Sequence, residues 1–283
     1  MRQILVALSL AGLMLGASPE LERARKLYSL TDFEGSLKAL RQVNPKDGDV
    51  YELIGRSHYM MGDYKKATEN LEKAMAADPS SSAHALWLGR AYGRRAETST
   101  LLTAPGHASK ARQYFEKAVQ LDPNNLEAIN DLFEYYLEAP GFLGGGYDKA
   151  AGLAGRIARI DPVEGHYAQA RLAEKRKEYG SAEEQLRRAA DLAPHQVGRL
   201  IDLARFLAKQ GRYQESEQSF QRAEAIAPES PQVMFARADT YIKNGRNLPA
   251  ARELLKKYLS ANLTPDDPPR YEAEKLLRQA SGS

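Results

Sequence analysis

The feature that most constrains the fold of this chain is a helix-hairpin unit that recurs along its length. In residues 48–81, two amphipathic segments are separated by Gly62-Asp63, and the unit ends at Pro79. Small and apolar residues recur on one face of each segment at intervals of three and four, which predicts two helices. Such a hairpin cannot bury its outer apolar face alone, so it needs neighbouring copies.

The second helix of each copy can be traced by its terminal proline. The spacing of Ala67, Leu71, Ala74 and Pro79 returns in three later segments, which are Ala111, Phe115, Ala118 and Pro123; Ala182, Leu186, Ala189 and Pro194; and Ser216, Phe220, Ala223 and Pro228. Within the unit, small Gly55 and Ala67 let the two backbones approach closely, while Leu71 fills the gap beside them. We therefore expect closely packed hairpins that stack from one end of the chain to the other.

With these positions and a period close to the roughly 34 residues of the tetratricopeptide repeat, the chain resembles that family over nearly all of its length after the first helix. The resemblance implies an all-α, right-handed solenoid of about seven hairpins plus a C-terminal capping helix, and a binding scaffold whose ligand is not specified. The segment from Phe133 to Gly146 also resembles bacterial exported members of unassigned role. We expect units near 18–47, 48–81, 82–125, 126–162, 163–196, 197–230 and 231–262, and a capping helix over 268–280.

Composition excludes several classes of function. The formal net charge is +3, too balanced for a domain that binds nucleic acid through a basic surface. The chain has no cysteine, which rules out disulfides, thiolate metal sites and cysteine nucleophiles. Its five histidines form no catalytic or zinc motif. We expect no catalytic residue, no metal and no cofactor, and an enzyme with an unrecognised site ranks third among the hypotheses.

Residues 1–17 have the layout of a secretory signal peptide. Arg2 precedes an apolar run from Ile4 to Leu15, and small residues follow up to Ser18. The run is too short to span a bilayer comfortably, so we expect cleavage after Ala17 and a mature chain without a membrane span. The alternatives are a short first helix packed on the next repeat and an uncleaved anchor. Export predicts a cell-envelope protein, in the bacterial periplasm.

A basic stripe is predicted along the first helices of the hairpins, which in the resembled family line the concave surface where extended peptides bind. Its members are Arg56, Arg90, Arg94, Arg171, Lys175, Arg205, Lys209 and Lys243. Like charges four residues apart destabilise an isolated helix by about 0.2 to 0.5 kcal/mol per pair, so they call for a compensating partner.

That partner can be internal or external. Glu134 and Glu138 lie between basic pairs of neighbouring units, and Asp239 follows Arg205 one unit later, so inter-repeat ion pairs could neutralise much of the stripe. Alternatively, the stripe holds an extended or acidic segment of a partner protein. The leading hypothesis is a non-catalytic protein-protein interaction scaffold of the cell envelope that uses this groove, and the sequence leaves the two interpretations of the stripe open.

Two hairpins carry insertions at their tips, in residues 98–107 and 140–146, with the helix after the first insertion expected from about Ala108. Both insertions include an Ala-Pro-Gly tripeptide, one repeat apart, so the loops should touch each other. We expect them to cover each other through their apolar residues, Leu101, Leu102, Phe142 and Leu143. In the alternative, Phe142 and Leu143 form an exposed patch through which a structural or regulatory subunit contacts its partner.

Overall fold

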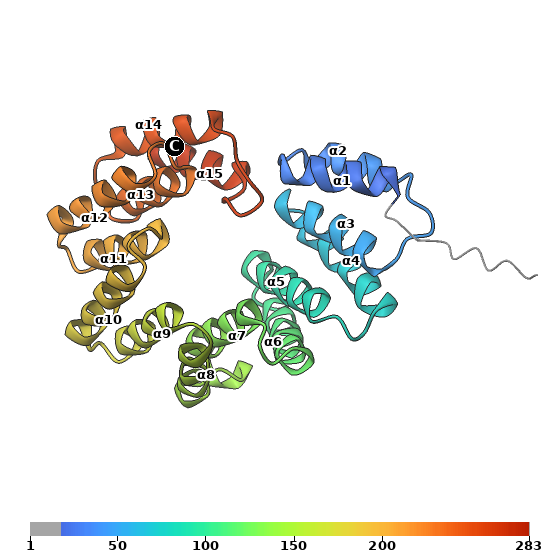
Figure 1. The fold of residues 1–283 in the computed structure, drawn as a ribbon, viewed down its shortest axis with the longest axis horizontal. Coiled ribbons are helices and arrows are strands. Elements are labelled where there is room, and N and C mark those ends of the chain that lie inside the picture. Colours follow the sequence, from blue (N-terminus) through green and yellow to red (C-terminus); the bar gives the residue numbers. More distant parts are fainter. Residues whose placement is uncertain (1–17, 283) are drawn as a thin grey trace, which may run out of the picture.

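The computed structural model describes residues 18–282, in which consecutive helices pack as hairpins (Figure 1). The hairpins are α1 (Pro19–Ser29) with α2 (Phe33–Leu40), α3 (Gly48–Met60) with α4 (Tyr64–Ala77), α5 (Ser82–Thr98) with α6 (Ala104–Leu121), α7 (Leu126–Glu138) with α8 (Tyr147–Ile160), α9 (Pro162–Lys175) with α10 (Tyr179–Leu192), α11 (Val197–Lys209) with α12 (Tyr213–Ile226), and α13 (Pro231–Lys243) with α14 (Leu248–Ser260). A last helix, α15 (Arg270–Ala280), covers the seventh hairpin. The prediction of an all-α solenoid is confirmed, while the predicted signal peptide lies outside the described residues.

The turns between helices follow from capping and glycine chemistry. Asp47 and Asp63 accept hydrogen bonds from the backbone N–H groups three residues later, at 2.9 and 3.1 Å, and so begin α3 and α4. Gly62, between these helices, has a φ of 76°, which a residue without a Cβ adopts at low cost. The two helices can therefore reverse direction within a few residues and pack side by side.

The predicted close packing within a hairpin is confirmed. A Cβ built on Gly55 of α3 would lie 2.5 Å from the Leu71 Cγ and 3.2 Å from the Ala67 carbonyl oxygen of α4. The next hairpin repeats the arrangement, because a Cβ on Gly89 would lie 2.6 Å from the ring of Phe115. The space beside the glycine of the first helix is thus filled by a large side chain from the second helix, and Leu71 is completely buried.

The stack of hairpins curves until its two ends meet, so the helices outline a ring (Figure 1). The hydroxyl groups of Tyr64 on α4 and Tyr271 on α15 share a hydrogen bond of 2.5 Å, between residues 207 positions apart in the chain. Arg94 on α5 donates to the Tyr64 hydroxyl at 3.0 Å and to the Glu272 carboxylate at 2.5 Å. We call the contacts among these four residues the seam. They make the concave face of the solenoid the inner wall of a ring.

The first insertion differs from the range predicted, 98–107. Helix α5 extends to Thr98 and α6 begins at Ala104, so only residues 99–103 connect them. The helix starts earlier than predicted because Pro105 lies in its first turn, where the N–H that proline lacks would have no partner within the helix. The extra residues lengthen both helices instead of forming a long loop.

The second insertion, 140–146, contains the short helix η1 (Gly141–Leu143) and packs against its own hairpin and α6. Tyr135 donates to the Leu143 carbonyl oxygen at 3.0 Å, and the Gly146 N–H donates to the Tyr136 carbonyl oxygen at 2.8 Å. These bonds hold the loop along the hairpin. The predicted mutual cover of the loops is therefore wrong: exposed fractions reach 93% for both Leu101 and Leu102 and 82% for Phe142, while Leu143 is half-buried.

Candidate functional site

The predicted basic stripe lies on odd-numbered helices, which form the inner row of the ring in Figure 1. Seven of its eight side chains are ion-paired within the chain. The pairs are Arg56 with Glu52, Arg90 with Glu127 and Asp131, Arg94 with Glu97 and Glu272, Arg171 with Glu134 and Glu138, Lys175 with Glu138, Lys209 with Glu174, and Lys243 with Asp239. Most of the charge along the stripe is thus compensated internally.

Several of these pairs join neighbouring hairpins. Arg171 on α9 contacts Glu134 and Glu138 on α7 at 3.0 and 2.8 Å. Arg90 on α5 contacts Asp131 on α7 at 2.5 Å. Most of these side chains are half-buried, so desolvation offsets part of each attraction. The main effect of the pairs is therefore to neutralise the groove in the middle of the solenoid.

Arg205 on α11 is the exception. Its expected partner Asp239 pairs instead with Lys243 at 2.8 Å, because the two lie one turn apart on the same helix. The Arg205 side chain is exposed and makes no ion pair or hydrogen bond with any residue between 18 and 282. Because no carboxylate of residues 18–282 lies in ion-pair contact with it, the Arg205 guanidinium on the inner wall is available to an anionic ligand.

Arg205 faces a cavity of about 770 Å³, which we call the central chamber. Its walls come from the α3–α4 turn, the start of α4, and helices α5, α11, α13 and α15, so both ends of the chain contribute. It is lined by Met61, Gly62, Tyr64, Arg94, Thr98, Arg205, Phe235, Asp239, Lys243, Tyr271, Glu272, Lys275, Leu276 and Gln279. Four basic and two acidic side chains leave a surplus of two positive charges. The volume lies within the roughly 300 to 1,000 Å³ typical of ligand pockets.

The chamber contains residues that the sequence did not assign to a site. Lys275 and Leu276 lie in the middle of the capping helix, where an exposed lysine is an ordinary residue of a helix surface. Phe235 has the spacing of a core residue on α13. The sequence around these residues does not indicate that they contact a ligand, since the chamber exists only after the two ends of the solenoid meet.

A smaller cavity of about 230 Å³ opens between α9 and α11, and Arg205 lines this cavity as well. It is lined by Tyr167, Arg171 and Asp202 among others. Burial raises the pKa of Asp202 to about 6, although Arg199 and Arg205 oppose the shift by favouring the carboxylate. This carboxyl group therefore changes its charge in a range where an ordinary aspartate is already ionised.

Asp202→Asn is expected to remove a pH-dependent loss of stability. Because the pKa of Asp202 is raised above its ordinary 3.8 in the folded chain, the folded state binds the proton more tightly than the unfolded state. The free energy of unfolding should fall as the pH rises from about 4 to about 6 and stay lower above that range. The difference between the ordinary pKa of 3.8 and the pKa of about 6 in the folded chain is worth at most about 3 kcal/mol.

Urea unfolding of both proteins near pH 4 and near pH 8 checks this expectation. Between pH 4 and pH 8, the unfolding free energy of the variant should rise by about 1 to 2 kcal/mol relative to that of the wild type. This is less than the maximum because the Asp202 side chain keeps some contact with solvent. If the free energies of unfolding of variant and wild type differ by the same amount at both pH values, Asp202 has an ordinary pKa.

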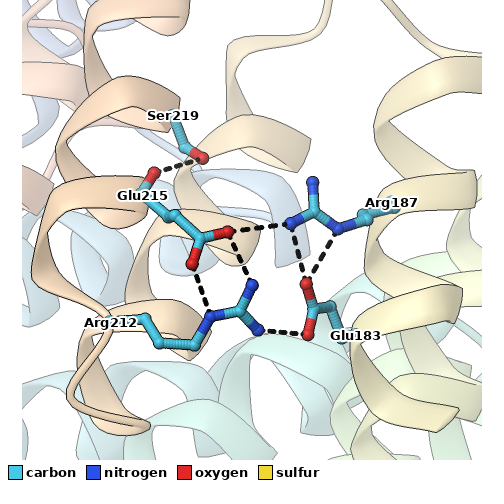
Figure 2. Close-up of polar contacts among 5 residues, drawn as sticks. All are labelled: Glu183, Arg187, Arg212, Glu215 and Ser219. Carbon is cyan, nitrogen blue, oxygen red and sulfur yellow. Dashed lines mark hydrogen bonds and ion pairs between the residues drawn. The ribbon is translucent and has the colours of Figure 1, made fainter. Parts of the chain in front are cut away.

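A four-charge network joins the outer helices α10 and α12 (Figure 2). Arg187 contacts Glu183 at 2.7 Å and Glu215 at 3.5 Å, while Arg212 contacts Glu215 at 2.6 Å and also pairs with Glu183. Ser219 donates to the backbone carbonyl oxygen of Glu215 at 3.1 Å. Each charge already has partners within the chain, so we interpret the network as a clip between neighbouring hairpins.

Two further properties bear on function. In the part of the chain that the structure describes, no group of three His, Asp or Glu side chains is placed to hold a metal ion. A search of the same residues for a helix with the length and apolar character needed to cross a membrane finds none.

Comparison with known proteins points to one family. Family models of the tetratricopeptide repeat match residues 52–126, 173–233 and 207–277. The Sol locus transcriptional repressor of Clostridium acetobutylicum is 31% identical over 88 residues, which are 31% of this chain and 24% of that protein. Cellulose synthase operon protein C of Escherichia coli is 27% identical over 95 residues, 32% of this chain and 8% of that protein. The chain thus matches about a quarter of these relatives' length or less.

Solved structures share the fold at low sequence identity. A tetratricopeptide repeat protein from Parabacteroides merdae superposes with a TM-score of 0.60 at 14% identity, covering 93% of this chain and 98% of that one. A second, from Thermus thermophilus, has a TM-score of 0.53 at 19% identity, covering 70% and 97%. Since the repeat models match more than half of the chain and the stacked hairpins agree with them, the protein belongs to the tetratricopeptide-repeat family.

Proposed function

We propose that this protein is a non-catalytic scaffold of the bacterial cell envelope that holds an extended, acidic segment of a partner protein inside its ring. Its family consists in general of interaction modules without catalytic activity, and the repeats indicate a protein partner. The observation that supports an acidic segment is Arg205, the one member of the stripe that makes no ion pair or hydrogen bond among the described residues. Its planar donors can hold a carboxylate through two hydrogen bonds.

Arg205→Glu is expected to weaken the binding of an acidic peptide by about tenfold or more, because a favourable charge contact becomes a repulsive one. Arg205→Lys should weaken it less, since the charge remains and the bidentate geometry is lost. Fluorescence anisotropy with a labelled hexaglutamate peptide, at low and high salt, measures both effects. Added salt should weaken binding to the wild type, because exposed charges are screened over about 8 Å at physiological ionic strength.

The charge-matched control is Lys257→Glu, which reverses an exposed cation on α14 outside the chamber lining. It should leave the affinity unchanged. Equal affinities of wild type and Arg205→Glu for the peptide at both salt concentrations would show that the groove does not bind the acidic segment.

The exposed tips of the third and fourth hairpins support a second candidate function. In this candidate, the protein is a structural or regulatory subunit that contacts its partner through Leu101, Leu102 and Phe142. Apolar side chains this exposed are typical of contact sites when they cluster. Co-purification on the immobilised mature chain distinguishes the two candidates. Loss of a partner with Phe142→Ser would support the tips, whereas loss with Arg205→Glu combined with Lys209→Glu would support the groove.

The cell-envelope location is supported by the layout of residues 1–17 alone. If it is correct, N-terminal sequencing of the protein from an envelope fraction should return Ser18 as the first residue. Recovery of Met1 from a soluble fraction free of envelope material would argue against export.

A further inference from the structure

We propose that the central chamber is a specific site for a segment in which a carboxylate lies next to a bulky apolar side chain, and that such a segment fastens the seam of the ring. The proposal rests on the proposed function, because both place a partner segment on the inner wall. Beyond the proposed function, the chamber site includes a second cation, which is Lys275, and an apolar wall. It also links ligand binding to the shape of the ring.

The first observation is the distribution of free charge. Among the charged residues that line the chamber, Arg94 pairs with Glu272 and Lys243 pairs with Asp239. Arg205 on α11 and Lys275 on α15 are both exposed, and neither makes an ion pair or hydrogen bond within residues 18–282. Two cations from different helices thus line one cavity without a direct ion pair, which favours an anionic group such as a carboxylate in that cavity.

The second observation is the apolar wall beside these cations. Met61 at the α3–α4 turn is 39% exposed, and half-buried Leu276 lies on α15 next to Lys275. Phe235 on α13 lines the same cavity and is nearly buried. An apolar side chain of the ligand would remove this surface from water, so a segment with both chemical features fits the chamber better than a purely acidic one.

The third observation is that the walls belong to both ends of the chain. Met61 and Tyr64 come from the second hairpin, whereas Phe235 and Lys275 come from the seventh hairpin and the capping helix. A ligand that touches both walls binds the closed ring more tightly than an open one. By linkage, it must shift the ring toward closure, and loosening the seam must weaken its binding.

Binding can be tested with three hexapeptides: alternating glutamate and leucine, alternating glutamine and leucine, and hexaglutamate. The first should bind at least about tenfold more tightly than the second, because it alone offers carboxylates to the free cations. It should also bind more tightly than hexaglutamate. Lys275→Glu and Lys275→Gln should each weaken the first peptide, while Lys257→Glu should not.

The shape of the ring provides a second readout. Since the chain has no cysteine, Lys38→Cys on α2 and Lys256→Cys on α14 take spin labels selectively. Double electron-electron resonance should show a broader distance distribution in the seam variant Tyr271→Phe with Glu272→Gln. The glutamate-leucine peptide should narrow it again and should bind this variant more weakly than the wild type, even though Glu272→Gln removes a negative charge from the chamber lining.

The outcomes separate this inference from the proposed function. If Arg205→Glu weakens binding but both Lys275 variants bind as the wild type does, the groove function stands and the chamber site is wrong. Equal binding of the glutamate-leucine peptide and hexaglutamate would overturn the apolar part. If the peptide binds the seam variant with unchanged affinity, the link to ring closure is overturned, and binding of neither acidic peptide would overturn both proposals.

Discussion

Ending the chain at Pro268, which removes helix α15, is expected to lower the free energy of unfolding by about 4 kcal/mol and to open the ring. The helix covers Leu255 and Tyr258 of the seventh hairpin, both completely buried, and buries its own Ala273 among them. Exposing two or three large apolar side chains costs about 1.5 to 3 kcal/mol each. The truncation also removes the acceptor of the Arg252 guanidinium, the Ala280 carbonyl oxygen at 2.8 Å.

Circular dichroism and small-angle scattering measure the two consequences. A loss of about 4 kcal/mol corresponds to a decrease in Tm of roughly 10 °C for a chain of this size, and the radius of gyration should increase as the ends separate. The seam variant Tyr271→Phe with Glu272→Gln is the control, because it removes polar contacts at the seam and leaves the apolar cover in place. It should open the ring with little change in Tm. An unchanged melting curve after truncation would contradict the capping role of α15.

Gly89→Ala is expected to destabilise the third hairpin by about 1 to 3 kcal/mol, the usual cost of an overpacked core. The added Cβ would lie 2.6 and 2.7 Å from two ring carbons of Phe115. That ring cannot retreat easily, since Phe115 is nearly buried and lies 6.4 Å from the Tyr135 ring of the next hairpin, measured between ring centroids. The added methyl group should therefore disturb the packing of the third hairpin and also its contact with the fourth.

Gly93, one turn later on the same helix, is a matched control because a Cβ there would meet nothing within 4 Å. Gly93→Ala should stabilise the protein by up to about 1 kcal/mol, since alanine favours a helix interior over glycine. Urea unfolding of the two variants should give shifts of opposite sign. Shifts of the same sign would show that packing against Phe115 does not determine the residue at position 89.

The ion pairs between neighbouring hairpins suggest how a scaffold can confine ligand binding to one region. In its middle repeats, the inner wall carries arginines that already hold carboxylates of the preceding hairpin, as Arg171 does with Glu134 and Glu138. A ligand would have to displace these contacts to bind there. At Arg205 no such displacement is needed, so the acidic segment that we propose would gain more by binding at the chamber than elsewhere along the groove.

The sequence by itself determined the helices, their pairing and the contacts inside each hairpin. The spacing of Gly55, Ala67 and Leu71 predicts close packing, and the structure places Leu71 where a Gly55 side chain would be. Such predictions succeed because each hairpin is a local unit whose faces can be read from a period of three to four residues. For the same reason, the stripe of cations on the first helices could be identified residue by residue.

Only the tertiary structure decided which of those cations are free, where the loops lie and that the ring closes. Asp239 pairs with Lys243 on its own helix and not with Arg205, a choice between two nearby cations that spacing does not resolve. The tips stay exposed because η1 packs along α6 and not against residues 99–103. The seam joins residues 178 and 207 positions apart, and their meeting depends on small rotations between neighbouring repeats that accumulate over the whole solenoid.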